Sequence, residues 1–101
     1  MSYQMVLEDK KSSEAISLFL AIRTKNIFEV DHLAEKGYIP AILKRLEFAA
    51  KNNDTQKITD LKNKGIELLQ NKEDKKLFLD DLENILEQNL PSIARKKVLK
   101  M

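Results

Sequence analysis

The chain has 101 residues, 43% of them hydrophobic and 34% charged, with two glycines, two prolines and no cysteine. This composition is too apolar for a disordered chain and too poor in turn residues for an all-β fold, and the length suits one domain. Without cysteine, disulfides, thiolate catalysis and cysteine-based metal sites are excluded, and the cytoplasm is the default compartment. We predict a single all-α domain over residues 1–101, a compact bundle of five to six short helices.

The charge is unevenly distributed along the chain. Residues 1–50 are balanced and residues 51–90 are slightly acidic, whereas the C-terminal segment 91–101 carries only basic charges, on Arg95, Lys96, Lys97 and Lys100. Proteins that wrap nucleic acid usually spread Lys and Arg over one face, so this pattern argues against a nucleic-acid partner. We expect the basic tail to contact an acidic partner or the acidic helix preceding it; a solvated tail is the alternative.

The N-terminal part gives one uncertain segment and one strongly apolar helix. Residues 1–11 show no targeting signal, and Tyr3, Met5 and Leu7 alternate like a strand that would have no partner. Ser12 and Ser13 are suited to cap a helix that reaches about residue 25. Because apolar residues surround this helix, we place it at the buried centre of the domain. No apolar stretch is long enough to span a membrane.

Two helices follow, separated by Gly37. The first covers about residues 27–36, and the second begins near Pro40 and reaches about Lys51. Residues 27–50 also suit a helix-turn-helix, with Lys44 and Arg45 on the recognition helix, which makes a small DNA-binding regulator an alternative function. The apolar start of that helix argues against it, since polar residues are expected there to contact bases.

The C-terminal half predicts three more helices. A polar break at residues 52–55 opens a helix to about residue 70, in which the interior Gly65 indicates close packing against a neighbour. The next helix begins after Asn71 and ends before Pro91. The last one covers residues 92–100 and forms the basic C-terminal helix of the domain.

Residues 30–70 resemble a single armadillo-type helical repeat. A short helix ends at Gly37, an Ile39-Pro40 pair opens the next helix, and a longer helix follows with Gly65, Ile66 and Leu69 at the family's small and apolar positions. In Lys62 and Leu68 the chain departs from the usual small apolar residue and asparagine. The resemblance implies armadillo- or HEAT-like local packing; a plain helical bundle that uses glycine and proline as helix punctuation is the other reading.

No constellation of residues points to catalysis or to a metal. His32 is the only histidine, so the Glu29-x-x-His32 spacing lacks the second pair that a di-iron site needs. The hydroxyl residues lie mostly where helix capping explains them, and the two glycines are isolated, which excludes a phosphate-binding loop. We therefore predict no enzyme activity, no cofactor and no metal site.

The remaining function class is binding of another macromolecule. We predict a non-catalytic protein–protein interaction module, such as an adaptor, chaperone or regulatory subunit, with a structural subunit of a homo-oligomer as a further alternative. The apolar arc of the helix near residues 72–90 is wider than one core contact requires, so we place the partner surface there together with the basic tail. The predicted partner-binding residues are Phe78, Leu79, Leu82, Ile85, Leu86, Arg95, Lys96, Lys97 and Lys100.

Overall fold

The computed structural model describes residues 3–99, apart from the side chains of residues 97 and 99, and this part of the chain is all-helical. Its helices are α1 (Tyr3–Leu7), α2 (Ser13–Arg23), α3 (Ile27–Glu35), α4 (Ile39–Lys51), α5 (Thr55–Leu68), α6 (Lys72–Asn89) and α7 (Ser92–Leu99). The predicted fold class is confirmed, and the six expected helices begin and end within a few residues of their predicted positions. The short α1 is additional, so the alternating Tyr3, Met5 and Leu7 belong to a helix.

The helix starts follow from polar side chains that accept hydrogen bonds from free backbone amides. The side chain of Ser12 accepts from the amide of Ala15 at 3.1 Å, and Asn26 caps α3 in the same way. Within the predicted polar break at residues 52–55, Asp54 is the cap of α5, and its side chain accepts from the amide of Lys57 at 3.2 Å. Gly37 has φ +93°, which lets the chain leave α3 sharply and enter α4.

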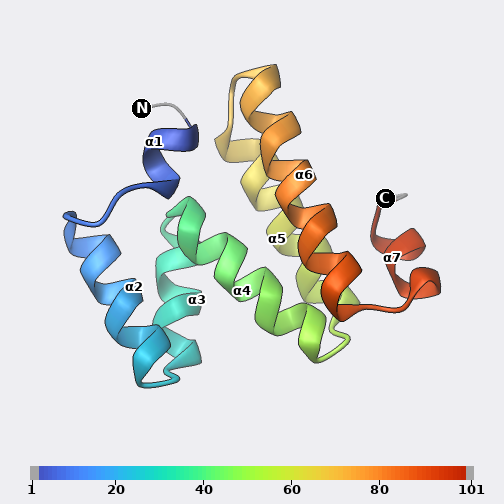
Figure 1. Ribbon diagram of the computed structural model, residues 1–101, viewed down its shortest axis with the longest axis horizontal. Helices are drawn as coiled ribbons and strands as arrows, with labels where there is room; N and C mark the ends of the chain where they lie inside the picture. The colour runs from blue at the N-terminus through green and yellow to red at the C-terminus, as the bar shows by residue number, and fades with distance from the viewer. Residues whose placement is uncertain (1–2, 100–101) are drawn as a thin grey trace.

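The centre of the molecule is α4, which packs against α3, α5 and α6 (Figure 1). Ala41, Ile42, Leu46 and Ala50 on α4 are fully buried. The prediction that the helix of residues 13–23 is central is wrong, since α2 lies at one edge and packs mainly against α3. Small residues on α4 let several helices approach it at once. Fewer helices pack against α2 than its apolar composition suggested.

The predicted close packing at Gly65 is confirmed, and the neighbour is an aromatic ring. A Cβ atom at this position of α5 would stand 2.2 Å from Cζ of Phe78 on α6. Phe78 is itself fully buried. The glycine therefore makes room for the largest fully buried side chain of the core.

Polar contacts tie the outer helices to this core. Asp31 on α3 pairs with Arg45 on α4 at 3.2 Å and with Lys57 on α5 at 3.0 Å, so one carboxylate joins three helices. The buried Lys62 donates to the backbone carbonyl of Val98 at 3.1 Å, which holds α7 against α5. The extents of the molecule are 38 × 32 × 19 Å, and the shortest of these corresponds to about two helix diameters.

Candidate interaction surface

The predicted partner surface on α6 is mostly part of the core. Phe78, Leu82 and Leu86 are fully buried, and Leu79 and Ile85 are partly buried against the same cluster. The expectation that these side chains form an exposed strip is wrong for the three buried residues, because α4 and α5 cover that face of α6. The apolar arc is wide because α6 has more than one packing partner.

The basic tail lies beside the acidic side of α6. Arg95 and Lys96 on α7 line a hollow of about 200 Å³ together with Glu83 and Glu87 of α6. This arrangement matches the alternative in which the tail faces the acidic helix of its own chain. The side chain of Lys97 and the whole of Lys100 lie outside the described residues. A role for the tail in binding a partner stays a prediction.

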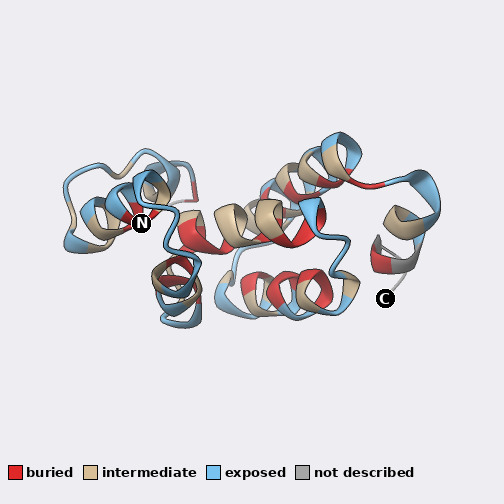
Figure 2. Ribbon diagram, turned by 90° about the horizontal axis from the view of Figure 1, so that it is seen from below, coloured by how far each residue is buried: buried red, intermediate tan, exposed pale blue. Residues whose placement is uncertain are grey.

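The exposed apolar surface is concentrated near the N-terminus instead. In the described part of the chain, seven of the ten exposed large apolar side chains fall within residues 5–28. Figure 2 shows the contrast: the helices on the side of the N-terminus are mostly blue and tan, whereas most of the red, buried backbone lies in the central helices. The seven residues are Met5, Leu7, Ile16, Phe19, Leu20, Ile27 and Phe28.

Three of these side chains form one face of α2. Ile16, Phe19 and Leu20 follow the i, i+3, i+4 spacing that puts residues side by side on a helix, and they are 52%, 58% and 54% exposed. Leu18 and Ala21, on the opposite face, are buried. We call the three exposed residues the α2 strip. The helix is thus apolar on both faces, and only one face is covered.

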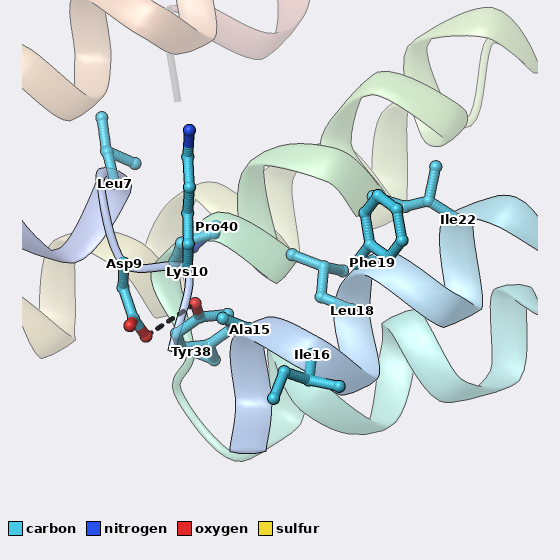
Figure 3. Close-up of a pocket in the computed structure, with 10 residues that line it drawn as sticks. All are labelled: Leu7, Asp9, Lys10, Ala15, Ile16, Leu18, Phe19, Ile22, Tyr38 and Pro40. Carbon is cyan, nitrogen blue, oxygen red and sulfur yellow. Dashed lines mark hydrogen bonds between the residues drawn. The ribbon is translucent and has the colours of Figure 1, made fainter. Parts of the chain in front are cut away.

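An apolar groove runs beside the α2 strip (Figure 3). It has a volume of about 500 Å³, within the range of roughly 300–1,000 Å³ typical of ligand pockets. Its walls come from the end of α1, the loop to α2, α2 itself and the start of α4. The groove is lined by Leu7, Asp9, Lys10, Ala15, Ile16, Leu18, Phe19, Ile22, Tyr38 and Pro40.

A hydrogen-bond cluster on Asp9 fixes the wall formed by the loop between α1 and α2. The Asp9 carboxylate accepts hydrogen bonds from the Ser12 hydroxyl, from the backbone amides of Lys11 and Ser12, each at 3.2 Å, and from the Tyr38 hydroxyl at 3.1 Å. The Ser12 hydroxyl contributes most to holding the pKa of Asp9 below its ordinary value. Burial and the bond to Asp9 raise the pKa of Tyr38, so this phenol stays a neutral donor.

A second tyrosine anchors α1, the other element of that wall. Tyr3 is buried, and its hydroxyl donates to the carboxylate of Asp81 on α6. Burial, together with this hydrogen bond, raises the pKa of Tyr3 above its ordinary value. Both parts of the wall are therefore attached to the core: α1 is hydrogen-bonded to α6, and the loop is hydrogen-bonded to Tyr38 at the start of α4.

The DNA-binding alternative requires a free recognition helix, and the structure places that helix at the centre. Ala41 and Ile42, at the start of α4, have no exposed surface. Lys44 pairs with Glu47 at 3.2 Å, and Arg45 pairs with Asp31. The side chains that would read bases are thus occupied within the chain, which argues against a groove-reading role for α4.

The structure brings no metal-ligand set together in the part of the chain that it describes. His32 is exposed on α3, and the neighbouring Asp31 is engaged with Arg45 and Lys57. Among residues 3–99, no three His, Asp or Glu side chains are placed to hold a metal ion. No helix over the same residues combines the length and apolar content needed to cross a lipid bilayer.

The α2 strip is the candidate site that sequence reasoning missed. The sequence did contain a signal for it, namely the apolar residues on all sides of residues 13–23. This pattern fits a helix that is buried within its own chain, and it fits equally a helix that has one face covered by another protein. Comparisons of the chain with models of protein families, with curated proteins and with solved structures found no match. The resemblance of residues 30–70 to an armadillo repeat accordingly stays a prediction.

Proposed function

We propose that the protein is a non-catalytic protein–protein interaction module that binds a helix of another protein on the α2 strip and in the adjoining groove. The observation that carries this proposal is the exposure of three large apolar side chains on one helix face beside an apolar hollow. When a partner covers apolar surface of this kind, binding is stabilised by about 25 cal/mol per Å² of surface buried. An adaptor, a chaperone or a regulatory subunit would use such a surface, and a cysteine-free chain suits the reducing cytoplasm.

A helix is the form of partner that suits this surface best. The α2 strip is a straight ridge of residues at helical spacing, and the groove beside it offers room for side chains of a second helix packed along the first. Helix-in-groove recognition uses this combination of a ridge, a hollow and a polar margin. Asp9, Lys10 and Tyr38 provide the polar groups of the groove.

The test begins with site-specific photo-crosslinking in cells of the native host. A photoreactive amino acid replaces Leu20, and in a control protein it replaces Leu77, an exposed leucine on α6 far from α2 along the chain. We expect a specific crosslinked protein from position 20 only, with the crosslink mapped to an amphipathic helix. The crosslinked protein is then purified for affinity measurements.

The affinity step separates binding from folding. Phe19→Asp and Leu20→Asp should leave the circular dichroism and thermal midpoint nearly unchanged, because both side chains are more than half exposed. Each should weaken binding about thirtyfold, the effect of removing a central interface residue. Leu77→Asp should leave the affinity unchanged. Full affinity of folded Phe19→Asp and Leu20→Asp variants would refute the proposal.

Sedimentation equilibrium of the purified protein tests the homo-oligomer alternative. A monomer that dimerises through the α2 strip would lose its dimer in the Phe19→Asp variant. If the protein is monomeric at all concentrations, the partner on the α2 strip is a different protein and not a second copy of this chain.

A further inference from the structure

We infer that the partner helix carries acidic residues at both ends of its apolar stripe; this inference rests on the proposed function. It follows from the charges that flank the α2 strip. Lys10 lines the groove at the N-terminal end of α2, and the Arg23 guanidinium lies 5.6 Å from the centre of the Phe19 ring at the C-terminal end. A helix laid along the strip therefore meets a cation at each end.

These cations form no ion pairs within the described part of the chain. Lys10 and Arg23 are exposed, as are the adjacent Lys11 and Lys25, and none of the four forms an ion pair with another described side chain. The nearest carboxylate in sequence, that of Asp9, already accepts hydrogen bonds from Ser12, Lys11 and Tyr38. In Figure 3 the Lys10 side chain extends away from Asp9, with its ammonium group at the far end.

The length of α2 determines how long the partner helix must be. The helix has 11 residues, which corresponds to about 16 Å at a rise of about 1.5 Å per residue. A partner helix of about 11 residues or more is needed to run along the whole of α2 and to bring acidic residues to both of its ends. Between them the partner must present apolar side chains at i, i+3, i+4 and i+7 to cover Phe19 and its neighbours.

An anionic membrane surface is the other class of partner that apolar residues with nearby cations could bind. It suits this surface less well, because Glu8, Asp9 and Glu14 alternate with the four cations along residues 8–25 and reduce the net charge of that stretch to +1. Membrane attraction depends on a cluster of several uncompensated Lys and Arg residues. A peptide helix differs from a membrane in that its charges are localised, so it can place carboxylates beside Lys10 and Arg23 only.

The test uses three labelled helical peptides of about 16 residues. All share one leucine stripe, and they carry glutamate, glutamine or lysine at both flanking positions. Fluorescence anisotropy with the full chain measures their affinities at low and high salt. We expect the glutamate peptide to bind about three- to tenfold more tightly than the glutamine peptide at low salt, as two exposed ion pairs allow, and the preference to shrink at high salt.

Charge-reversed proteins supply the matched control. In the double variant Lys10→Glu with Arg23→Glu, the preference should reverse in favour of the lysine peptide. The double variant Lys72→Glu with Lys76→Glu makes the same change of net charge on exposed residues of α6, and it should keep the original preference. An equal effect of both double variants would mean that overall charge, and not the ends of the α2 strip, selects the peptide, which would overturn the inference.

The remaining outcomes separate this inference from the proposed function. If the three peptides bind equally and Leu20→Asp abolishes all binding, the charge inference is wrong and the proposed function stands. If no peptide binds, the inference is overturned, and the crosslinking experiment decides the proposed function independently. Cosedimentation with phosphatidylserine vesicles that requires Lys10 and Arg23, without competition by the glutamate peptide, would assign the surface to a membrane and overturn the inference as well.

Discussion

Replacing Gly65 by alanine should destabilise the protein, although the same change at an exposed helix position stabilises it. In the interior of an exposed helix, alanine is favoured over glycine by about 1 kcal/mol. At Gly65 the new Cβ would stand 2.2 Å from Cζ, 2.5 Å from Cε2 and 2.8 Å from Cε1 of Phe78. Carbon atoms pack at about 3.5–4.0 Å, so the ring must retreat by roughly 1 Å or more.

The ring is enclosed by the core. Phe78 is fully buried, with Ile42, Leu46 and Leu82 in the same core cluster, so its displacement disturbs several packed side chains. Overpacking of this kind costs about 1–3 kcal/mol, which outweighs the gain in helix propensity. We expect Gly65→Ala to lower the free energy of unfolding by about 1–2 kcal/mol and the thermal midpoint by roughly 4–16 °C. Gly65→Leu should lower both by more.

A double-mutant cycle tests the assigned cause. Phe78→Leu removes the clashing ring atoms, so alanine at position 65 should be tolerated, or even favourable, in that background. The control Asn63→Ala lies at an exposed position of the same helix and should be neutral or slightly stabilising. Urea and thermal unfolding of the four variants provide the energies. If Gly65→Ala raises the midpoint as much as Asn63→Ala, or if its effect is the same with Leu at position 78, the reasoning is refuted.

Three further substitutions test other parts of the structure. Asp9→Asn should lower the free energy of unfolding at neutral pH and make it depend less on pH in the acid range. The Ser12 hydroxyl lowers the pKa of Asp9 in the folded protein, so the ionised carboxylate stabilises the fold. This stabilisation is fully present above the unfolded-state pKa of about 3.9 and is lost as the pH falls through the lowered folded-state pKa. Urea midpoints across the acid range measure this, and parallel curves for variant and wild type would contradict it. Asp31→Asn should lower the free energy of unfolding by about 1–2 kcal/mol, because it leaves Arg45 and Lys57 without their carboxylate partner, whereas Lys57→Gln should lower it by about 1 kcal/mol or less. Equal losses for the two variants in chemical unfolding would disprove the shared pairing. Gly37→Ala should cost about 1–2 kcal/mol in the same assay, since φ there is +93°, and an unchanged stability would show that the turn relaxes to a negative φ.

Local sequence signals were sufficient for the helices themselves. Side-chain caps at Ser12 and Asn71, the Gly37 stop and the Pro40 start each act within a few residues, so they determine the boundaries without knowledge of the rest of the chain. The N-terminal helix α1 escaped prediction because its anchor is not local. Tyr3 is held by Asp81, a contact that spans most of the chain.

The order of the helices in space could not be predicted by the same means. An apolar helix face indicates that the face is covered, but it does not indicate which element covers it. The wide apolar arc of α6 and the apolar circumference of α2 therefore looked alike in sequence, although Leu82 on α6 is fully buried and Leu20 on α2 is 54% exposed. What separates them is the number of helices that pack on each, and this depends on contacts between distant parts of the chain.

The position of α2 at the edge of the molecule separates binding from folding. Its inner face, with Leu18 and Ala21, packs against the rest of the chain, and its outer face contributes little to the core. We therefore expect a substitution on the outer face to change the free energy of the proposed binding with little change in the free energy of unfolding. On α4 or α6 the same kind of substitution removes core contacts. Residues of the α2 strip can thus vary without loss of the fold, which is why we place the proposed recognition surface at this edge of the domain.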